Sequence, residues 1–372
     1  MLSFWEKDFF VEYDHIIVGS GIVGLSTAVS LKEKDPKAKV LVLERGIFPT
    51  GASTKNAGFA CFGSLSELAA DLKTLSEDEV FELVKLRWEG LQLLRKRLGD
   101  DPIDFKNYGG YEILQSSELQ ALDYLDQVNE LLSPLFNDQV YELQNEKISK
   151  LGFPSEKIEA LVFNPFESQV HTGKLMKSLW HYAAALGVEV FTGAQVVAFE
   201  EPSAHTEVAL ADGPTFKARQ LAFCTNAFSK FFFPKLDLEP GRGTVLVTEP
   251  FKDLSWKGTF HYDEGYYYFR NYQDRVIFGG GRNLDLKTEQ TTNFNINEKI
   301  LAKLKKDLQE IILPEKEVKV EHVWSGIMAF GPDKRPILHK PSPRTTVGVR
   351  LGGMGVAIGS QLGRELAEMM LQ

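Results

Sequence analysis

The sequence predicts a mixed fold, α/β together with α+β, in which a domain with a parallel sheet is interleaved with a domain built on an antiparallel sheet. Two observations indicate the parallel sheet: a strand, glycine-rich turn and helix at residues 13–34, and a second helix followed by a strand at residues 171–191. Alternating strands with tight turns at residues 244–280 indicate the antiparallel sheet. The chain of 372 residues has no repeat or Pro-rich linker, so we expect the second domain to enter the first through long insertions.

The first unit begins with an apolar strand at residues 13–18 that runs directly into the turn GSGIVG at residues 19–24. Gly19 permits the tight turn off the strand, and Gly21 lets the backbone approach a pyrophosphate. Gly24 lets the following helix pack closely on the strand.

The helix from Ile22 to about Lys34 points its N-terminal amides and positive dipole end toward the phosphates. A second apolar strand at residues 40–43 ends on Glu44. A carboxylate at this strand tip accepts both hydroxyls of an adenosine ribose and repels a 2′-phosphate. The complete order of strand, turn, helix, strand and acid predicts a Rossmann-like unit that binds a dinucleotide.

The rest of the chain continues with both helical and alternating patterns. Helix spacing at residues 64–98 and 117–135, around a short strand at 110–114, predicts an inserted α+β piece. Further strands are predicted at residues 188–191, 195–199, 206–210, 220–224 and 318–324, and further helices at Phe228, at 297–312 and at 359–371.

Charge and composition narrow the class of partner. The chain carries 42 Lys and Arg against 51 Asp and Glu, a net charge of −9, and it has no basic run. This argues against nucleic acid and against an anionic membrane surface, and favours small molecules. The N-terminus lacks the pattern of a signal peptide, and no apolar run approaches the roughly 18 residues of a transmembrane segment, so we predict a cytoplasmic protein.

The cysteines and histidines do not indicate a metal site or a disulfide. Cys61 and Cys224 are far apart and fall in no C-x-x-C spacing, so we expect buried thiols. None of the seven histidines forms a spaced pair suggestive of a metal, and no metal is predicted.

Four further segments follow in an order that resembles one family: Gly51–Gly58, Trp324–Ile327, Pro332–Pro336 and Gly352–Ala357. Together with the glycine-rich turn, they resemble the FAD-dependent oxidoreductases of the D-amino acid oxidase-like family, which includes glycine oxidase, sarcosine oxidase and γ-glutamylputrescine oxidoreductase. The resemblance spans most of the chain. The strands within residues 267–280 are most similar to those of the amine-oxidising members.

The resemblance implies that a flavin takes a hydride from the carbon bearing a substrate amine or amino acid nitrogen, and that water hydrolyses the resulting imine. Gly279–Gly281 opens no helix, so the chain has no second nicotinamide unit, and oxygen, a quinone or an electron-carrier protein is the expected electron acceptor. Cys61 follows the small-residue loop, but the family's attachment cysteine lies near the Trp-Ser-Gly segment, which has none here. We therefore expect noncovalent FAD.

Small residues at two further places suit a bound flavin. The loop at residues 51–58 lets backbone amides reach the cofactor, and the glycine run ahead of the last helix directs free amides at the negative charge of the reduced ring. The residues predicted to bind the cofactor are Gly19, Gly21, Ile22, Val23, Gly24, Glu44, Arg45, Gly51, Ala52, Ser53, Asn56, Ala57, Gly58, Val196, Thr225, Asn226, Gly326, Gly353, Met354, Gly355 and Val356.

Three residues are predicted to act on the substrate. Arg270 is the expected anchor for a carboxylate, because it lies on an alternating strand beside a cluster of tyrosines. Alternation places Tyr268 on the same face as Arg270. Lys55, in the loop expected near the flavin, is a candidate for assisting the substrate or oxygen, against the alternative of a solvated loop lysine.

Two departures from the family pattern make an α-amino acid less secure as the substrate and oxygen less secure as the electron acceptor. Glycine oxidase-like members have an arginine for the substrate carboxylate where this chain has Met328. Sarcosine oxidases have a lysine that assists oxygen on the strand equivalent to Arg275–Phe278, which here has none. His171 is given no catalytic role.

The predicted cofactor domain comprises residues 1–90, 150–230 and 322–372, and the predicted substrate domain comprises 91–149 and 231–321. Three alternatives stay open: a 2-hydroxy acid oxidoreductase on the same fold, a flavin-binding redox sensor without turnover, and an NAD-binding protein without flavin. The first would need a base for an alcohol proton, and no histidine stands in an evident position for that role.

Overall fold

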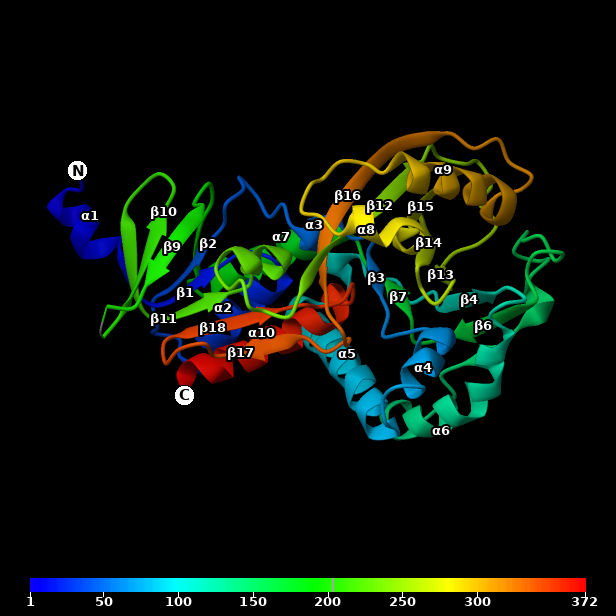
Figure 1. Cartoon of the computed structure of the whole chain (residues 1–372), viewed down its shortest axis with the longest axis horizontal. Helices are drawn as coiled ribbons and strands as arrows, with labels where there is room; N and C mark the ends of the chain where they lie inside the picture. The colour runs from blue at the N-terminus through cyan, green and yellow to red at the C-terminus, as the bar shows by residue number, and fades with distance from the viewer. Residues whose placement is uncertain (203) are drawn as a thin grey trace.

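The computed structural model describes residues 1–202 and 204–372 and places two eight-stranded sheets side by side along the long axis of the molecule (Figure 1). The first sheet has the strand order β17-β18-β11-β1-β2-β8, with β10 attached to β11 and β9 to β10. Its strands are β1 (Glu12–Val18), β2 (Val40–Leu43), β8 (Glu189–Phe191), β9 (Val196–Glu200), β10 (Thr206–Leu210), β11 (Thr215–Phe223), β17 (Ile337–His339) and β18 (Thr345–Val349).

Parallel pairing at the centre of this sheet follows from the apolar runs. Ile17 of β1 pairs with Val42 of β2 on one side and with Ala222 of β11 on the other. All three are fully buried, as expected for parallel strands that are covered on both faces.

One face of the first sheet is covered by helices α2 (Ile22–Lys34), α7 (Thr172–Ala185) and α10 (Gly355–Leu371), with α5 (Glu77–Leu98) packed on α10. The helices α2 and α10 approach closely because Gly359 has no side chain. A Cβ at Gly359 would lie 2.6 Å from Cγ2 of Ile22. The last helix of the chain is therefore locked onto the first βα unit.

The second sheet is predominantly antiparallel, with the order β16-β12-β15-β14-β13-β4-β6-β5. Its strands are β4 (Gly110–Leu114), β5 (Glu142–Leu143), β6 (Ala160–Asn164), β12 (Glu239–Thr248), β13 (Thr259–Tyr262), β14 (Tyr267–Tyr272), β15 (Arg275–Gly280) and β16 (Val320–Phe330). One face packs on α9 (Glu298–Asp307) and the π-helical turn η6 (Leu308–Ile312) through an apolar core that includes Phe260 and Phe278.

The remaining elements are short connections and an inserted helical layer. They are α1 (Phe4–Phe9), α3 (Ala52–Lys55), β3 (Phe59–Ala60), α4 (Leu65–Leu72), η1 (Asp101–Ile103), η2 (Leu119–Tyr124), α6 (Leu125–Phe136), η3 (Asn145–Lys147), β7 (Ser168–Gln169), η4 (Asn226–Phe231), η5 (Arg282–Asp285) and α8 (Leu286–Glu289). In the described parts of the chain, no helix combines the length and apolarity needed to cross a bilayer.

The predicted mixed fold is confirmed, with local differences. The helical pattern at residues 64–98 forms two helices, because Ser76 and Glu79 make a capping box that begins α5. The last helix begins at Gly355, earlier than predicted, and Phe228 lies in a short 3₁₀ helix. The domain boundaries stay a prediction, although β6 pairs in the second sheet while its residues were assigned to the cofactor domain.

Candidate active site

A cavity of about 880 Å³ lies between the carboxyl ends of the first sheet's strands and the open face of the second sheet. Val18 and Leu43, the last residues of β1 and β2, line one end, and Tyr268 and His261 line the other. Ligand sites commonly occupy about 300–1,000 Å³, and the ends of parallel strands are where α/β sheets bind nucleotides. The volume and the location both suit a large dinucleotide.

The glycine-rich turn is packed so closely that side chains would disrupt it. Gly19 has a φ of +104°, and a Cβ there would lie 2.9 Å from the Cys224 carbonyl oxygen. A Cβ on Gly24 would lie 1.9 Å from the Gly19 carbonyl oxygen. Ser53 steadies the start of α2, because its Oγ accepts a hydrogen bond of 3.0 Å from the Ile22 amide.

Glu44 is held in place by its own chain at the edge of the cavity. One carboxylate oxygen accepts hydrogen bonds from the Ser20 amide at 3.0 Å and the Ser20 hydroxyl at 2.7 Å, and the other accepts from the Gly46 amide at 2.9 Å. An ionised carboxylate has about four acceptor positions, so Glu44 retains capacity for ribose hydroxyls.

Two glycine segments make a cradle beside the turn. A Cβ at Gly51 or at Gly352 would meet no atom within 4 Å, so both glycines border open space. Gly352 and Gly353 have φ values of +56° and +89°, which lead the chain into α10 without a side-chain cap. The first amides of α10 therefore remain available to a ligand, and this cradle fits a bound flavin.

The part of the cavity lined by Arg45 and Phe228 suits the adenine ring of a dinucleotide. The Arg45 guanidinium lies over the Phe228 ring, 4.0 Å from its centroid, and both residues line the cavity. Val196 and Thr225 contribute to the same wall. Asn226, with a φ of +48°, accepts a hydrogen bond from the Arg350 amide and so fixes the turn after β11.

The structure brings together all but two of the predicted cofactor residues as cavity lining. The lining members are Gly19, Gly21, Ile22, Val23, Glu44, Arg45, Gly51, Ala52, Ser53, Asn56, Ala57, Val196, Thr225, Asn226, Gly326, Gly353, Met354, Gly355 and Val356. Gly24 lies under the turn, and Gly58 packs on Val170 and Arg270, so neither lines the cavity.

Arg270 is placed differently from the expectation that it anchors a substrate. Its guanidinium donates hydrogen bonds to the main-chain carbonyls of Ala57, Val170 and Asn271, and the side chain does not line the cavity. Burial lowers the pKa of Arg270 to about 10. Arg270 lies on the predicted face of β14. Its hydrogen bonds connect the loop after α3 to the second sheet, and its side chain does not face the cavity.

Arg282 lines the cavity near the second sheet, and no pattern in the sequence pointed to it. It follows the glycines at the end of β15, and its guanidinium lies 3.9 Å from the centroid of the Phe330 ring. Within residues 1–202 and 204–372 it has no hydrogen bond or ion pair. The nearby acid Glu289 is held by Arg242 through bonds of 2.6 and 2.9 Å. Burial lowers the pKa of Arg282, as expected for a cation without a counterion.

Three aromatic side chains form the wall of the cavity over the second sheet. Tyr268 of β14 lies opposite His261 of β13 in the strand register. The Phe59 ring makes edge-to-face contacts with both, with its centroid 5.5 Å from that of Tyr268 and 5.1 Å from that of His261. Gly279 makes room for Tyr268, because a Cβ there would lie 2.9 Å from the phenol oxygen. Burial raises the pKa of Tyr268 to about 12, so its hydroxyl remains a hydrogen-bond donor.

His261 pairs with a buried acid. Its Nε2 lies 3.0 Å from a carboxylate oxygen of Glu167, which also accepts a 2.9 Å bond from the Thr259 hydroxyl. Cys61 also lies here, with its Sγ, a Glu167 oxygen and a His261 nitrogen within 4.8 Å of one another. We assign no metal to this cluster, since the Glu167 oxygen already accepts two hydrogen bonds. The sequence indicated no histidine in an evident position for a base, whereas the structure places His261 in the lining of the cavity.

A buried ion network closes the wall next to this pair. Lys334 lies 3.1 Å from Glu67 and 2.7 Å from Asp71, and Arg87 lies 3.3 Å from Glu67. Burial raises the pKa of Glu67, but Lys334 and Arg87 outweigh it and the pKa lies below its ordinary value. Lys334 belongs to a segment that the sequence analysis used only as a family motif.

Lys55 and Met328 both line the cavity where β16 meets α3. The Lys55 ammonium lies 5.3 Å from the Phe294 ring centroid, and its carbonyl accepts a 2.9 Å bond from Nε1 of Trp324. Met328 and Phe330 lie two residues apart on β16. Phe330 is the ring that contacts the Arg282 guanidinium, so Met328 and the ring under Arg282 belong to the same strand.

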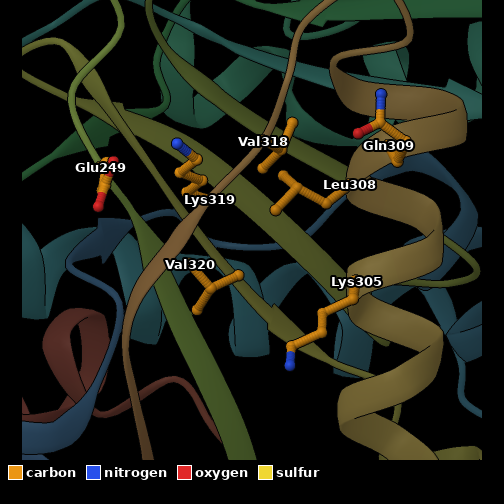
Figure 2. A pocket seen from close by; sticks show the side chains of 7 residues that line it. All are labelled: Glu249, Lys305, Leu308, Gln309, Val318, Lys319 and Val320. Atoms are coloured by element: carbon orange, nitrogen blue, oxygen red, sulfur yellow. The ribbon is translucent and has the colours of Figure 1, made fainter.

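A second pocket, about 480 Å³, lies apart from this cavity and shares no residue with it. Figure 2 shows it between the helix α9 and the strand β16, with exposed polar side chains at its rim. Its lining residues are Glu249, Lys305, Leu308, Gln309, Val318, Lys319 and Val320.

Comparisons with known proteins agree with this arrangement. A family model described as "FAD dependent oxidoreductase" (DAO) matches residues 14–369. The probable oxidoreductase OrdL of Haemophilus influenzae is 23% identical over 96% of this chain and 83% of its own length, and the glycine oxidase of Bacillus licheniformis is 24% identical over 96% and 93%.

Solved structures share the fold. L-proline dehydrogenase from P. horikoshii has a TM-score of 0.78 at 16% identity, over 97% of this chain and 93% of that one. Glycine oxidase from Geobacillus kaustophilus has a TM-score of 0.77 at 19% identity, over 96% and 95%. Because the family model spans nearly the whole chain, this protein belongs to the DAO family of FAD-dependent oxidoreductases.

Proposed function

We propose that the protein oxidises the C–N bond of an amino acid or other amine that carries a carboxylate, with FAD as the hydride acceptor and an imine as the first product. The observation that carries this proposal is the continuity of one cavity from the Glu44 edge to the chamber of Tyr268, His261 and Arg282. The names of similar proteins, glycine oxidase and iminodiacetate oxidase among them, support a nitrogen-bearing substrate.

Bound FAD supplies the hydride acceptor, and the chain binds and orients it. Glu44 would accept the ribose hydroxyls, and the start of α2 would face the pyrophosphate. The amides at the start of α10 would stabilise negative charge on the reduced ring. The Arg45 and Phe228 pair would border the adenine.

Arg282 takes the place of Arg270 as the proposed carboxylate anchor. A guanidinium forms two parallel hydrogen bonds with a carboxylate, and Arg282 has no partner of its own within the described chain. The guanidinium carbon lies 3.9 Å from the centroid of the Phe330 ring, a cation–π contact that would restrict the side chain. The Tyr268 hydroxyl would donate a further hydrogen bond to the substrate.

An anaerobic titration of the purified, yellow protein tests this proposal. Glycine, sarcosine, proline, iminodiacetate, putrescine and lactate would be added in turn while the flavin absorbance is followed. We expect at least one carboxylated amine to bleach the flavin, with ammonia or a primary amine as a product. Bleaching by lactate alone would support the second candidate function, a 2-hydroxy acid oxidoreductase, which His261 favours as an available base. A stable flavin that no compound bleaches would support a redox sensor, and absence of flavin would contradict the proposal.

We further propose that the electron acceptor is oxygen, a quinone or a carrier protein, and that the enzyme works in the cytoplasm. The strand β15 has no lysine facing the cavity, so reoxidation rates with air and with a soluble quinone need direct comparison. Fractionation of cells that express the full chain tests the location.

A further inference from the structure

The two ring nitrogens of His261 have different surroundings. Nε2 faces Glu167 at 3.0 Å, and Glu167 is only 2% exposed. Nδ1 forms no hydrogen bond with any residue that the structure describes, and the side chain lines the cavity. The imidazole therefore has one nitrogen fixed by a buried carboxylate and the other free for a ligand.

Several titratable groups from different elements face this ring. Glu167 comes from the turn before β7, Glu112 from β4, Glu67 from α4, Cys61 from the end of β3, and Tyr268 from β14. Burial lowers the pKa of His261, but the acids Glu167, Glu112 and Glu67 outweigh it, so the pKa lies above its ordinary value. Burial also raises the pKa of the Cys61 thiol, which leaves it neutral.

Amine oxidation has a proton requirement that this arrangement meets. The nitrogen lone pair forms the C=N bond as the hydride leaves, so an ammonium substrate must first lose a proton. A base works best when its pKa lies near the working pH, and the acids around His261 raise its pKa and so make it a stronger base than a free imidazole.

We infer that His261 accepts the ammonium proton of the substrate at Nδ1, and that Glu167 is the positioning residue that stabilises the imidazolium. The inference rests on the function proposed above. One N–H bond of the ammonium breaks and one Nδ1–H bond forms. The amine lone pair then becomes the second bond of C=N while the C–H electron pair leaves as hydride. Glu167 keeps its hydrogen bond to Nε2 throughout the step, as the acid of a hydrogen-bonded histidine does in hydrolytic triads.

The pH dependence of anaerobic flavin reduction by the best amine substrate tests this role. In the wild type, we expect the second-order rate constant to rise with pH through the pKa of His261 and to reach a plateau above it. In His261→Gln, the rate at pH 7.5 should fall about 100-fold or more and then rise with pH toward the pKa of the amine itself. His322→Gln, which removes an exposed imidazole of β16, serves as the control and should keep the wild-type profile.

Glu167→Gln provides a second test that does not depend on turnover. The ring signals of His261, assigned by triple-resonance NMR of the wild-type protein, would be titrated in the apo-protein. We expect a pKa above 6.5 in the wild type and a lower one in Glu167→Gln, with the acid limb of the rate profile shifted to lower pH by the same amount.

The outcomes separate this inference from the proposed function. If no amine reduces the flavin, the proposed function fails, and the inference with it. If amines reduce it but His261→Gln retains the wild-type pH profile and rate, only the inference is overturned. If His261→Gln loses FAD or does not fold, an unshifted histidine titration in Glu167→Gln overturns it. Flavin content and melting temperature are measured for every variant.

Discussion

A buried guanidinium is satisfied either by its own chain or by a ligand. Arg270 is of the first kind, with three main-chain carbonyls around it, whereas Arg282 is only partly buried and has an aromatic ring beside it but no hydrogen bond or ion pair in the described structure. From these partners we propose different roles for the two arginines, although Arg270 lies in β14 and Arg282 lies just after β15 of the same hairpin.

Substitution of Arg282 should affect substrates according to their charge. Arg282→Met should remove a bidentate contact worth about 2–3 kcal/mol, so affinity for carboxylated amines should fall about 30- to 150-fold while putrescine is affected little. Kinetics of flavin reduction with both classes measure the difference. Arg282→Lys, which keeps the charge without the planar fork, should lose less, and an equal loss for both substrate classes would contradict the assignment.

Substitution of Arg270 should affect the structure more than substrate choice. Arg270→Ala leaves three buried carbonyls without their donor, and we expect a loss of about 3 kcal/mol in unfolding free energy together with lower FAD occupancy. Denaturation in urea and the flavin content of the purified protein measure both. If the variant were fully stable but bound substrate poorly, the original assignment of Arg270 as anchor would be restored.

At the scale of elements, the cofactor end could be predicted from the sequence because its parts lie within one βαβ unit. The glycines of residues 19–24 and Glu44 are joined by a single helix, so their spacing determines their geometry. Alternation along β14 correctly placed Tyr268 and Arg270 on the same face of the strand. It could not show that the cavity reaches Tyr268 but does not reach Arg270. Arg282 lies beyond the strand, in η5, where no periodicity applies.

The contact between His261 and Glu167 could not be predicted from the sequence, for another reason. The two residues are 94 positions apart and meet only because β13 pairs with β4 and the chain after β6 returns to the same face. Strand order of this kind depends on long-range packing. No motif of either residue indicated the contact.

The βα turn supplies a test at the level of the element. Gly24→Ala would place a Cβ 1.9 Å from the Gly19 carbonyl oxygen, so α2 must move away from β1. We expect a loss of about 1–3 kcal/mol in stability and weak FAD binding. Gly51→Ala is the matched control, because its Cβ meets nothing within 4 Å, and the apo-protein should melt within a few degrees of the wild type. Equal melting temperatures for both variants would show that α2 tolerates the shift.

At the scale of the whole molecule, Glu118 joins the inserted helical layer to the hairpin of β13 and β14. Its carboxylate accepts hydrogen bonds from the Gln115 and Glu264 amides, and burial raises its pKa to about 7. The folded state thus holds a proton that the unfolded chain releases from about pH 4.3 upward. Stability from this group is lost as the pH rises from about 4.3 to about 7, and the penalty is complete above that window.

Glu118→Gln should remove this dependence. We expect the fall in unfolding free energy between about pH 5 and pH 8 to shrink by about 2 kcal/mol in the variant. Urea denaturation at a series of pH values measures it, with the exposed Glu146→Gln as control. An unchanged pH profile would mean that Glu118 ionises normally in the folded protein.

The contact between α2 and α10 has a consequence for how the protein is made. The turn at residues 19–24 is synthesised well before α10, but Gly355 and Val356 line the same cavity as that turn, and Gly359 packs on Ile22. A nascent chain on the ribosome therefore carries the nucleotide-binding turn long before the helix that completes it. We expect the cavity to be complete only once α10 has been synthesised, so a product truncated before α10 would lack that side of the cavity and would leave the face of α2 that packs on α10 uncovered.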